Sequence, residues 1–283
     1  MRPLADLPLD ALADVRVVFT DIDDTLTSDG RLPADAYAAL ERLEAAGLAV
    51  VPITGRPAGW CDMIARFWPV AGVVGENGAF YFTYDRAQRK MIQRFFASDE
   101  ERRRNRLRLD ALRERILAEV PGTGIASDQL YREADLAIDV CEDVEPLPRS
   151  QVDRVLAIFA EAGAVAKLSS IHVNGWFGDY DKLSMTRRFT ADVFGRDLDA
   201  EKDRFVFVGD SPNDGPMFGF FPLSCGVANI RDFADGSVVL PAWVAEGHGG
   251  AGFVEVAERL LAARMAKDTA TTDHPVVEEL RHG

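Results

Sequence analysis

The sequence predicts an α/β fold, with a Rossmann-like parallel-sheet core and an inserted α+β cap domain. Three short apolar runs at residues 15–21, 47–55 and 204–210 each end in a polar loop, a pattern typical of strands buried on both faces. Between the first two, residues 33–47 carry an apolar helical face that is closed by Gly47. A strand, a helix and a strand in this order predict parallel strands joined by a right-handed crossover.

The segment between the second and third strands has helices and strands of its own. These predicted elements lie at residues 79–84, 99–120, 135–140, 150–163, 164–168 and 170–175. Glycine-containing segments at both joins, GENGA at 75–79 and NGWFG at 174–178, suit linkers that bend. We therefore expect residues 1–78 and 179–266 to form the core, and residues 79–178 to form the cap.

The C-terminal part completes the predicted core. Residues 221–229 and 236–240 have the apolar character of further strands, and residues 251–266 have that of a closing helix. Residues 267–283 lack a sustained apolar period, so we expect a mobile tail there.

Composition limits the classes of partner. The net charge is −14, and anionic partners are bound by clustered Lys and Arg, so we expect neither nucleic acid nor membrane as a partner. No window reaches the roughly 20 apolar residues of a membrane span, and the N-terminus lacks a signal-peptide pattern. The 3 cysteines have no CxxC spacing, which favours reduced thiols over disulfides or a zinc site. We expect a cytoplasmic protein that is a monomer or a homodimer.

The first strand ends in the acidic segment DIDDT, which places Asp21, Asp23 and Asp24 in one loop. Two like charges roughly 4 Å apart repel by about 4 kcal/mol at an effective dielectric constant of about 20, so the cluster needs a cation or a chemical role. Asp21 and Asp23 are two residues apart, so both side chains can point the same way. One could attack as a nucleophile while the other transfers a proton. An acidic turn that caps a helix is the alternative.

A phosphate group could approach this loop only with a cation. Asp210 and Asp214 lie in the segment GDSPND, at the end of the third strand. Ligands of open parallel sheets bind beyond the carboxyl ends of the strands, so these side chains should meet the DIDDT loop. Carboxylate oxygens are the ligands that Mg²⁺ prefers, and we expect Mg²⁺ as the cofactor.

Phosphoryl transfer also needs hydrogen-bond donors and a fixed positive charge. Thr54 and backbone N–H groups beside Gly55 follow the second strand and can hold a phosphoryl oxygen. Lys182 follows the insert and can supply the charge, with Lys167 and Lys202 as alternatives. Thr54 could instead cap a helix.

Four ordered motifs resemble those of the haloacid dehalogenase (HAD) superfamily of phosphatases. They are DIDDT at 21–25, ITGR at 53–56, Lys182, and GDSPND at 209–214. The resemblance covers about residues 15–240, and four motifs in order are far more specific than one. The insert between the second and third motifs resembles the cap of the type IIB subgroup, which is Cof-like or sucrose-phosphatase-like.

The resemblance implies a role for each matching residue. Asp21 would be the nucleophile, Asp23 the general acid and base, and Thr54 and Lys182 would bind the phosphoryl group. The implied Mg²⁺ site consists of Asp21, the backbone carbonyl of Asp23, Asp210 and the supporting Asp214, with Asn213 orienting the loop. Asp24 is a departure, because many relatives carry glycine there.

Further residues are expected on the substrate side. Gly55 and Arg56 belong to the ITGR motif, and Asn77 matches the NGA segment of the subgroup. His172 and Asn174 lie in SIHVNGWFGDYD, where polar and aromatic groups alternate. This segment could contact the leaving group of a substrate, with ordinary strand packing as the alternative.

Together these features predict a Mg²⁺-dependent phosphatase that acts on a small phosphorylated metabolite. A sugar phosphate or a related phosphate monoester would be hydrolysed through an aspartyl phosphate. A phosphomutase of the phosphomannomutase type is one alternative. A non-catalytic module that binds phosphorylated metabolites is another, although such a module would be expected to have lost Asp21 or Asp23.

Overall fold

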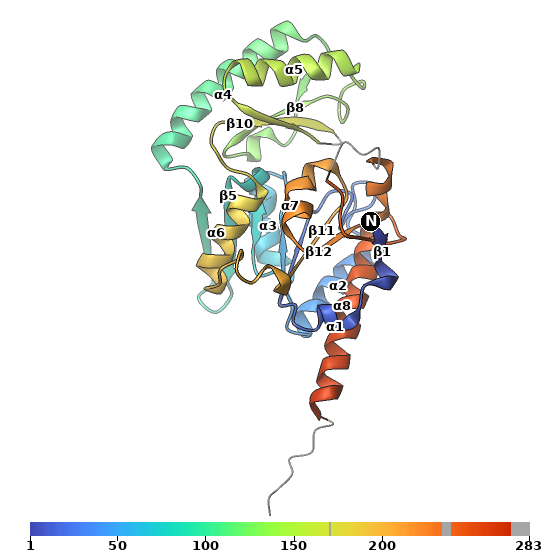
Figure 1. Cartoon of the computed structure of the whole chain (residues 1–283). Helices are drawn as coiled ribbons and strands as arrows, with labels where there is room; N and C mark the ends of the chain where they lie inside the picture. Colours follow the sequence, from blue (N-terminus) through green and yellow to red (C-terminus); the bar gives the residue numbers. More distant parts are fainter. Residues whose placement is uncertain (170, 234–238, 273–283) are drawn as a thin grey trace, which may run out of the picture.

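The core is built on a parallel sheet (Figure 1). The computed structural model describes residues 1–169, 171–233 and 239–272. Six strands lie in the order β1, β13, β12, β11, β2, β3, and each neighbouring pair is parallel. They are β1 (Arg2–Pro3), β2 (Val17–Thr20), β3 (Ala49–Pro52), β11 (Phe205–Gly209), β12 (Leu223–Gly226) and β13 (Trp243–Val244). The predicted α/β class with a parallel core sheet is confirmed.

Helices cover both faces of this sheet. They are α1 (Leu9–Leu12), α2 (Ala34–Ala45), α3 (Ala58–Phe67), α6 (Lys182–Phe194), α7 (Gly215–Phe220) and α8 (Gly249–Thr272). Successive strand residues point to opposite faces. Val18 and Val206 therefore pack in one apolar cluster with α2 and α8, while Phe19 and Phe207 pack in a second cluster with α6 and α7. This two-sided burial explains why the predicted strands read as continuous apolar runs.

A small antiparallel sheet extends the core beyond β3. It consists of β4 (Val73–Gly75), β5 (Phe80–Asp85) and β6 (Lys90–Phe95), and a bridge between Ile53 and Val74 joins it to the end of β3. Phe80 and Phe82 are buried in the same apolar cluster as β2. The sequence assigned this strand to the insert, whereas in the structure it packs with core residues; the cap boundary expected at residue 79 stays a prediction. An alternating strand shows which face is buried but not which domain buries it.

The cap is an antiparallel sheet with two helices on one face (Figure 1). Its elements are α4 (Asp99–Glu119), β7 (Gly124–Ile125), β8 (Asp135–Asp139), α5 (Arg149–Glu161), β9 (Val165–Leu168) and β10 (His172–Trp176). Leu136, Ile138 and Val173 pack in a cap cluster with α4 and α5. Because strand side chains alternate, His172 and Asn174 lie on the opposite face of this sheet, toward the core.

The C-terminal elements differ in part from the prediction. Helix α8 continues to Thr272, so residues 267–272 are helical rather than part of a tail. The remaining tail and most of the strand predicted at 236–240 lie outside the described residues. Val239 and Leu240 are described and are not in a strand; the final strand of the sheet is β13. None of the described helices is both long enough and apolar enough to cross a membrane.

Candidate active site

Three carboxylates converge at the carboxyl ends of two neighbouring core strands. Asp21 directly follows β2 and Asp210 directly follows β11, and these strands pair in register up to Thr20 and Val208. Asp214 ends the short 3-10 helix that comes after Asp210. One oxygen from each of the three carboxylates lies within 4.8 Å of the other two. The parallel topology thus brings together residues that are about 190 positions apart in the sequence.

A buried ammonium group lies among these carboxylates. Lys182 is the first residue of α6, and its Nζ donates to Asp21 Oδ1 at 2.7 Å and to Asp214 Oδ1 at 2.8 Å. The start of α6 is fixed by a capping box between Asp181 and Ser184. It is also fixed by Gly78, whose φ is +106° and where a Cβ atom would lie 2.1 Å from the Asp181 carbonyl oxygen. Of the three lysines considered from sequence, the structure places Lys182 against Asp21.

Burial sets the electrostatics of this cluster. Burial raises the pKa of Asp21 to about 7, Lys182 opposes that rise, and Asp214 adds to it. Burial and the neighbouring carboxylates also raise the pKa of Asp210 to about 9. Burial alone would lower the pKa of Lys182, but Asp21 and Asp214 raise it above its usual value. Three carboxylates against one ammonium group leave an excess of negative charge, and the oxygen-only ligand set suits Mg²⁺.

The side chain of Asp23 points away from this cluster and pairs with Arg56. Arg56 Nε and Nη2 donate to Asp23 Oδ1 at 2.9 and 2.6 Å, and Nε also donates to Oδ2 at 3.1 Å. The Arg56 guanidinium lies 4.5 Å from the centroid of the Trp60 ring and 4.0 Å from Asp128 Oδ2 of the cap. The Asp23 carboxylate is therefore held by Arg56 and is not one of the three clustered carboxylates, and metal binding by its backbone carbonyl stays a prediction.

The loop after β3 contains the buried hydroxyl of Thr54 and is covered by Asn77. The buried Thr54 hydroxyl accepts the Arg56 N–H at 3.0 Å, which leaves its own proton available. Asn77 adopts a left-handed conformation with φ of 56° and donates its N–H to the Thr54 carbonyl. A Cβ atom at Gly55 would lie 3.2 Å from the Asn77 amide nitrogen, so glycine lets Asn77 fold over the loop.

The backbone conformation at Asp24 explains why this position can carry either glycine or aspartate. Its φ is 55°, in the left-handed region where glycine is unstrained and Asp is among the better tolerated residues. Its N–H donates to the Thr27 hydroxyl, and its carbonyl accepts the amide of Asn229, so the turn is held on both sides. The position therefore requires a backbone conformation rather than a charge.

A cavity of about 660 Å³, which includes its open mouth, lies between the core loops and the cap sheet. On the core side the predicted residues Gly55, Arg56, Asn77 and Asn213 line it together with Asp21, Asp23, Asp24 and Asp210. The cap side is lined by Arg132, Lys167, Ser169, Ile171, His172 and Asn174. Thr54, Lys182 and Asp214 lie behind this surface, where they contact lining residues.

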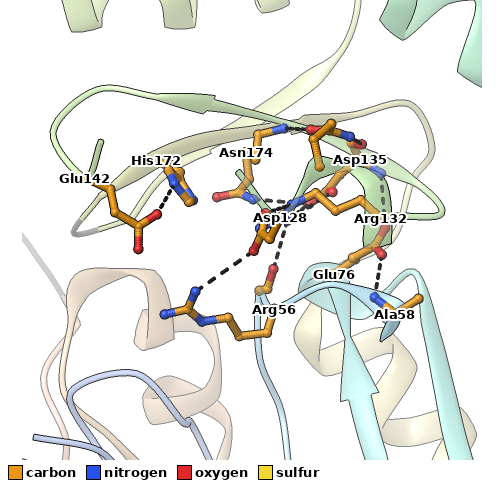
Figure 2. Close-up of polar contacts among 12 residues, drawn as sticks. Arg56, Ala58, Glu76, Asp128, Arg132, Asp135, Glu142, His172 and Asn174 are labelled. Carbon is orange, nitrogen blue, oxygen red and sulfur yellow. Dashed lines mark hydrogen bonds and ion pairs between the residues drawn. The ribbon is translucent and has the colours of Figure 1, made fainter. Parts of the chain in front are cut away.

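Two of the predicted cap residues present buried polar groups to this cavity (Figure 2). His172 Nε2 lies 2.9 Å from Glu142 Oε2, although the angle is not that of a hydrogen bond. Asn174 donates to Asp135 at 3.2 Å. The aromatic residues that follow do not share this position: Trp176 is buried and stacks on Tyr180 with centroids 5.7 Å apart, so the packing alternative holds for them.

Sequence reasoning missed the residues that join the cap to this site. Arg132 lines the cavity, and the buried Glu76 lies behind it (Figure 2). Glu76 stands in the GENGA segment, which drew attention only to Asn77. Arg132 stands in YREAD, which matches no motif, so no sequence signal could have found it.

Comparisons with known proteins agree with this geometry. Residues 18–103 match the family model of haloacid dehalogenase-like hydrolases. A structure from Thermoplasma acidophilum has a TM-score of 0.66 and 19% identity, with 87% of this chain and 98% of that chain covered. A sugar phosphatase of HAD subclass IIB has a TM-score of 0.58 and 15% identity, with 89% and 100% covered. A trehalose-6-phosphate phosphatase related protein has a TM-score of 0.57 and 14% identity, with 90% and 99% covered.

The search of curated protein sequences found no significant match. The structural likenesses extend over both the core and the cap, because each covers nearly the whole of this chain. At these identities they establish the fold, and the chemistry must be argued from the site itself.

Proposed function

Residues 18–103 match haloacid dehalogenase-like hydrolases, and from that premise we propose that the chain is a Mg²⁺-dependent phosphatase of small phosphate monoesters. A sugar phosphate or a related metabolite would be hydrolysed through an aspartyl phosphate on Asp21. The observation that carries this proposal is the contact of Asp21 with Lys182, inside a three-carboxylate cluster that faces a cavity under the cap. The subclass IIB sugar phosphatase and the trehalose-6-phosphate phosphatase related protein among the structural neighbours support the same reaction class.

The residues present fit a bound Mg²⁺ ion. Asp21, Asp210 and Asp214 would hold it, together with the backbone carbonyl of Asp23. When bound, Mg²⁺ would supply positive charge that lets a phosphate dianion approach the carboxylates and that stabilises charge on the transferring group. The pKa values of Asp21 and Asp210, which burial raises, indicate that this cluster favours an added positive charge.

The chain's own residues would carry out the transfer in two steps. An Asp21 oxygen forms a bond to phosphorus as the bond between phosphorus and the leaving oxygen breaks, and Asp23 gives a proton to that oxygen. Asp23 then takes a proton from the water that attacks phosphorus, the bond from Asp21 to phosphorus breaks, and inorganic phosphate leaves. Lys182 orients the Asp21 carboxylate through its 2.7 Å hydrogen bond.

Stabilisation of the transferring phosphoryl group would come from the loop after β3 and from Lys182. The Thr54 hydroxyl has its proton available, and Gly55 brings backbone N–H groups to the cavity without a side chain in the way. The leaving group would face the cap, where His172, Asn174 and Lys167 offer polar contacts. These contacts suit a small polar metabolite; a cytoplasmic location and a monomeric or homodimeric state remain predictions.

The proposal is tested with the variant Asp21→Asn. We expect a loss of Mg²⁺-dependent phosphate release of at least about a thousandfold, because an amide cannot act as the nucleophile. Asp24→Asn is the matched control, since Asp24 also lines the cavity but has no assigned chemical step. Both proteins should keep the wild-type circular dichroism spectrum. Unchanged turnover in Asp21→Asn would remove Asp21 from this role, and an isomeric sugar phosphate in place of inorganic phosphate would favour the phosphomutase.

A further inference from the structure

A single buried carboxylate connects the cap to the core (Figure 2). Glu76 lies in the core, immediately after β4, and its side chain is 0% exposed. It accepts the N–H of Ala58 at the start of α3 at 3.0 Å. It also accepts three successive N–H groups of the cap, those of Glu133 at 2.9 Å, Ala134 at 2.6 Å and Asp135 at 3.2 Å. These bonds hold Asp135, the first residue of β8, and the two residues before it against the core.

A buried guanidinium makes the reverse connection, from the cap to the core. Arg132 donates to both oxygens of Asp128 at 2.9 and 3.0 Å and to Asp135 at 3.0 Å, so its position within the cap is fixed. Its Nη1 also donates to the carbonyl of Gly55 at 3.1 Å. Gly55 belongs to the loop that is proposed to bind the phosphoryl group, so cap and loop are held as one unit.

Apolar contacts accompany these polar bonds. Trp176 at the end of β10 is buried in the apolar cluster of the core. Tyr131 of the cap lies against α3, and a Cβ atom built on Gly59 would be 2.9 Å from the Tyr131 Cβ. Lifting the cap would break the three bonds from Glu76 to the cap, the bond from Arg132 to Gly55 and these apolar contacts together, and Glu76 would keep only its bond from Ala58.

We propose that Glu76 and Arg132 are positioning residues that keep the cap seated on the core throughout turnover. The cavity has an open mouth with the cap seated, and we expect a small substrate to enter by this route. The substrate class is therefore monoesters of small polar alcohols whose leaving group fits the seated cavity, and phosphorylated peptides are excluded. This inference rests on the proposed phosphatase function for its substrate class, but the seating of the cap can be measured without turnover.

The direct test locks the cap with a disulfide between Gly59→Cys and Tyr131→Cys. Disulfide Cβ atoms lie roughly 3.5 to 4.5 Å apart, so a shift of about 1 Å lets these two positions bond, and both are exposed to oxidant. With the cap seated, the two thiols should pair rapidly, and the oxidised protein should hydrolyse a small sugar phosphate within about twofold of its reduced form. The single variants Gly59→Cys and Tyr131→Cys control for effects of oxidation on the native thiols.

Two results of this test would overturn the inference. One is loss of turnover on oxidation that a reductant restores, because the cap would then have to open. The other is failure of the two thiols to pair in folded protein, because the faces would then not be in contact in solution. A phosphopeptide hydrolysed as fast as a small sugar phosphate would overturn the substrate class.

Hydrogen exchange provides a readout that is independent of activity. The backbone amides of Glu133, Ala134 and Asp135 should exchange slowly in the wild-type protein and much faster in Glu76→Gln. Asp153→Asn is the matched control, because it also replaces a carboxylate by its amide, but one in an exposed ion pair with Arg149 on the cap. Fast exchange of the three amides in the wild type would refute a seated cap even if the protein proved to have no phosphatase activity.

Discussion

Two regions of this protein bury carboxylates whose pKa values are raised well above the ordinary range, yet the hydrogen-bond partners of these carboxylates differ. At the core edge, where Asp21 follows β2 and Asp210 follows β11, burial raises the pKa of Asp21 to about 7 and that of Asp210 to about 9. At the junction with the cap, burial raises the pKa of Glu76 to about 8. A raised pKa alone therefore does not identify the reactive group.

The hydrogen-bond partners separate the two regions. Four backbone N–H groups point at Glu76, which does not line the cavity, so its lone pairs are occupied within the fold. Asp21 and Asp210 line the cavity and receive side-chain donors from Lys182 and Thr25, so they keep lone pairs that can face a ligand. Glu76, whose oxygens are fully hydrogen-bonded within the protein, suits a role in positioning the cap. Asp21 and Asp210, which keep free lone pairs, suit binding of a cation and a phosphoryl group.

We expect the largest effect on catalysis from a substitution at the core edge. Lys182→Met should lower kcat by roughly 10²- to 10³-fold, because it removes the fixed positive charge beside Asp21. Lys167→Met is the matched control: Lys167 also lines the cavity, but from the cap, and its loss should act mainly on KM. Steady-state kinetics of both variants on one sugar phosphate would check this. Equal effects on kcat would mean that the sequence-based choice of Lys182 over Lys167 was wrong.

Metal should affect the core edge and leave the junction unchanged. A chelator should abolish turnover, and Mg²⁺ at about 100 times its Kd should raise the free energy of unfolding by roughly 2.7 kcal/mol. Asp210→Asn should reduce this stabilisation because it removes a proposed ligand. Thermal unfolding with and without Mg²⁺ measures both. A Mg²⁺ response in Asp210→Asn equal to that of the wild type would remove Asp210 from the metal site.

The pH dependence of stability follows from the same carboxylates. The folded pKa values of Asp21 and Asp210 lie above the ordinary Asp value of 3.8, so the folded state without metal holds more protons than the unfolded state. Their contribution to stability is present at low pH and is lost as the pH rises through about 7 for Asp21 and about 9 for Asp210. The stabilisation by Mg²⁺ should therefore grow over this range. Denaturant titrations with and without Mg²⁺ at several pH values measure this stabilisation. A stabilisation that does not change with pH would contradict the prediction.

Replacing the buried carboxylate at the junction between cap and core should lower the stability of the protein. Glu76→Gln should lower the free energy of unfolding by about 2 kcal/mol, because buried N–H groups lose acceptors. Asp153→Asn in the exposed ion pair should change it by less than about 0.5 kcal/mol. Urea unfolding of the two variants gives the comparison. A Glu76→Gln protein as stable as Asp153→Asn would show that the junction contributes little.

The sequence predicted the core edge far better than the junction. Apolar strands that end in DIDDT and GDSPND must place Asp21 and Asp210 together once the strands are parallel neighbours, so chain topology alone brings them close. The confirmed fold class depends on the same regularity, and so does the match of residues 18–103 to the haloacid dehalogenase-like family model. The roles of the individual site residues stay predictions.

The junction could not be predicted, for a physical reason. Glu76 binds backbone N–H groups, which every residue except proline carries, so no side-chain pattern in the cap marks its partners. Arg132 reaches a backbone carbonyl in the same way. The packing of Phe80 and Phe82 against core residues was not predicted for a related reason, because their alternation does not specify the surface that buries them.

The smallest expected effect concerns the backbone of the acidic loop. Asp24→Gly should change stability by no more than about 1 kcal/mol, because relief of the left-handed conformation is offset by greater freedom in the unfolded chain. Asp24→Val should be clearly less stable than Asp24→Gly, because a β-branched residue is strained at φ of 55°. Thermal unfolding of the pair separates a conformational requirement from one for charge, and equal stabilities would contradict the first.

The covalent intermediate is the central claim, and trapping it is the most direct test. Protein turning over a sugar phosphate with Mg²⁺ would be quenched in acid, treated with borohydride and digested, and the peptides would be examined by mass spectrometry. We predict reduction of a single acyl phosphate to homoserine at Asp21 and no such product from Asp21→Asn. Reduction at another carboxylate, or turnover with no reducible phosphorylated residue, would contradict the account.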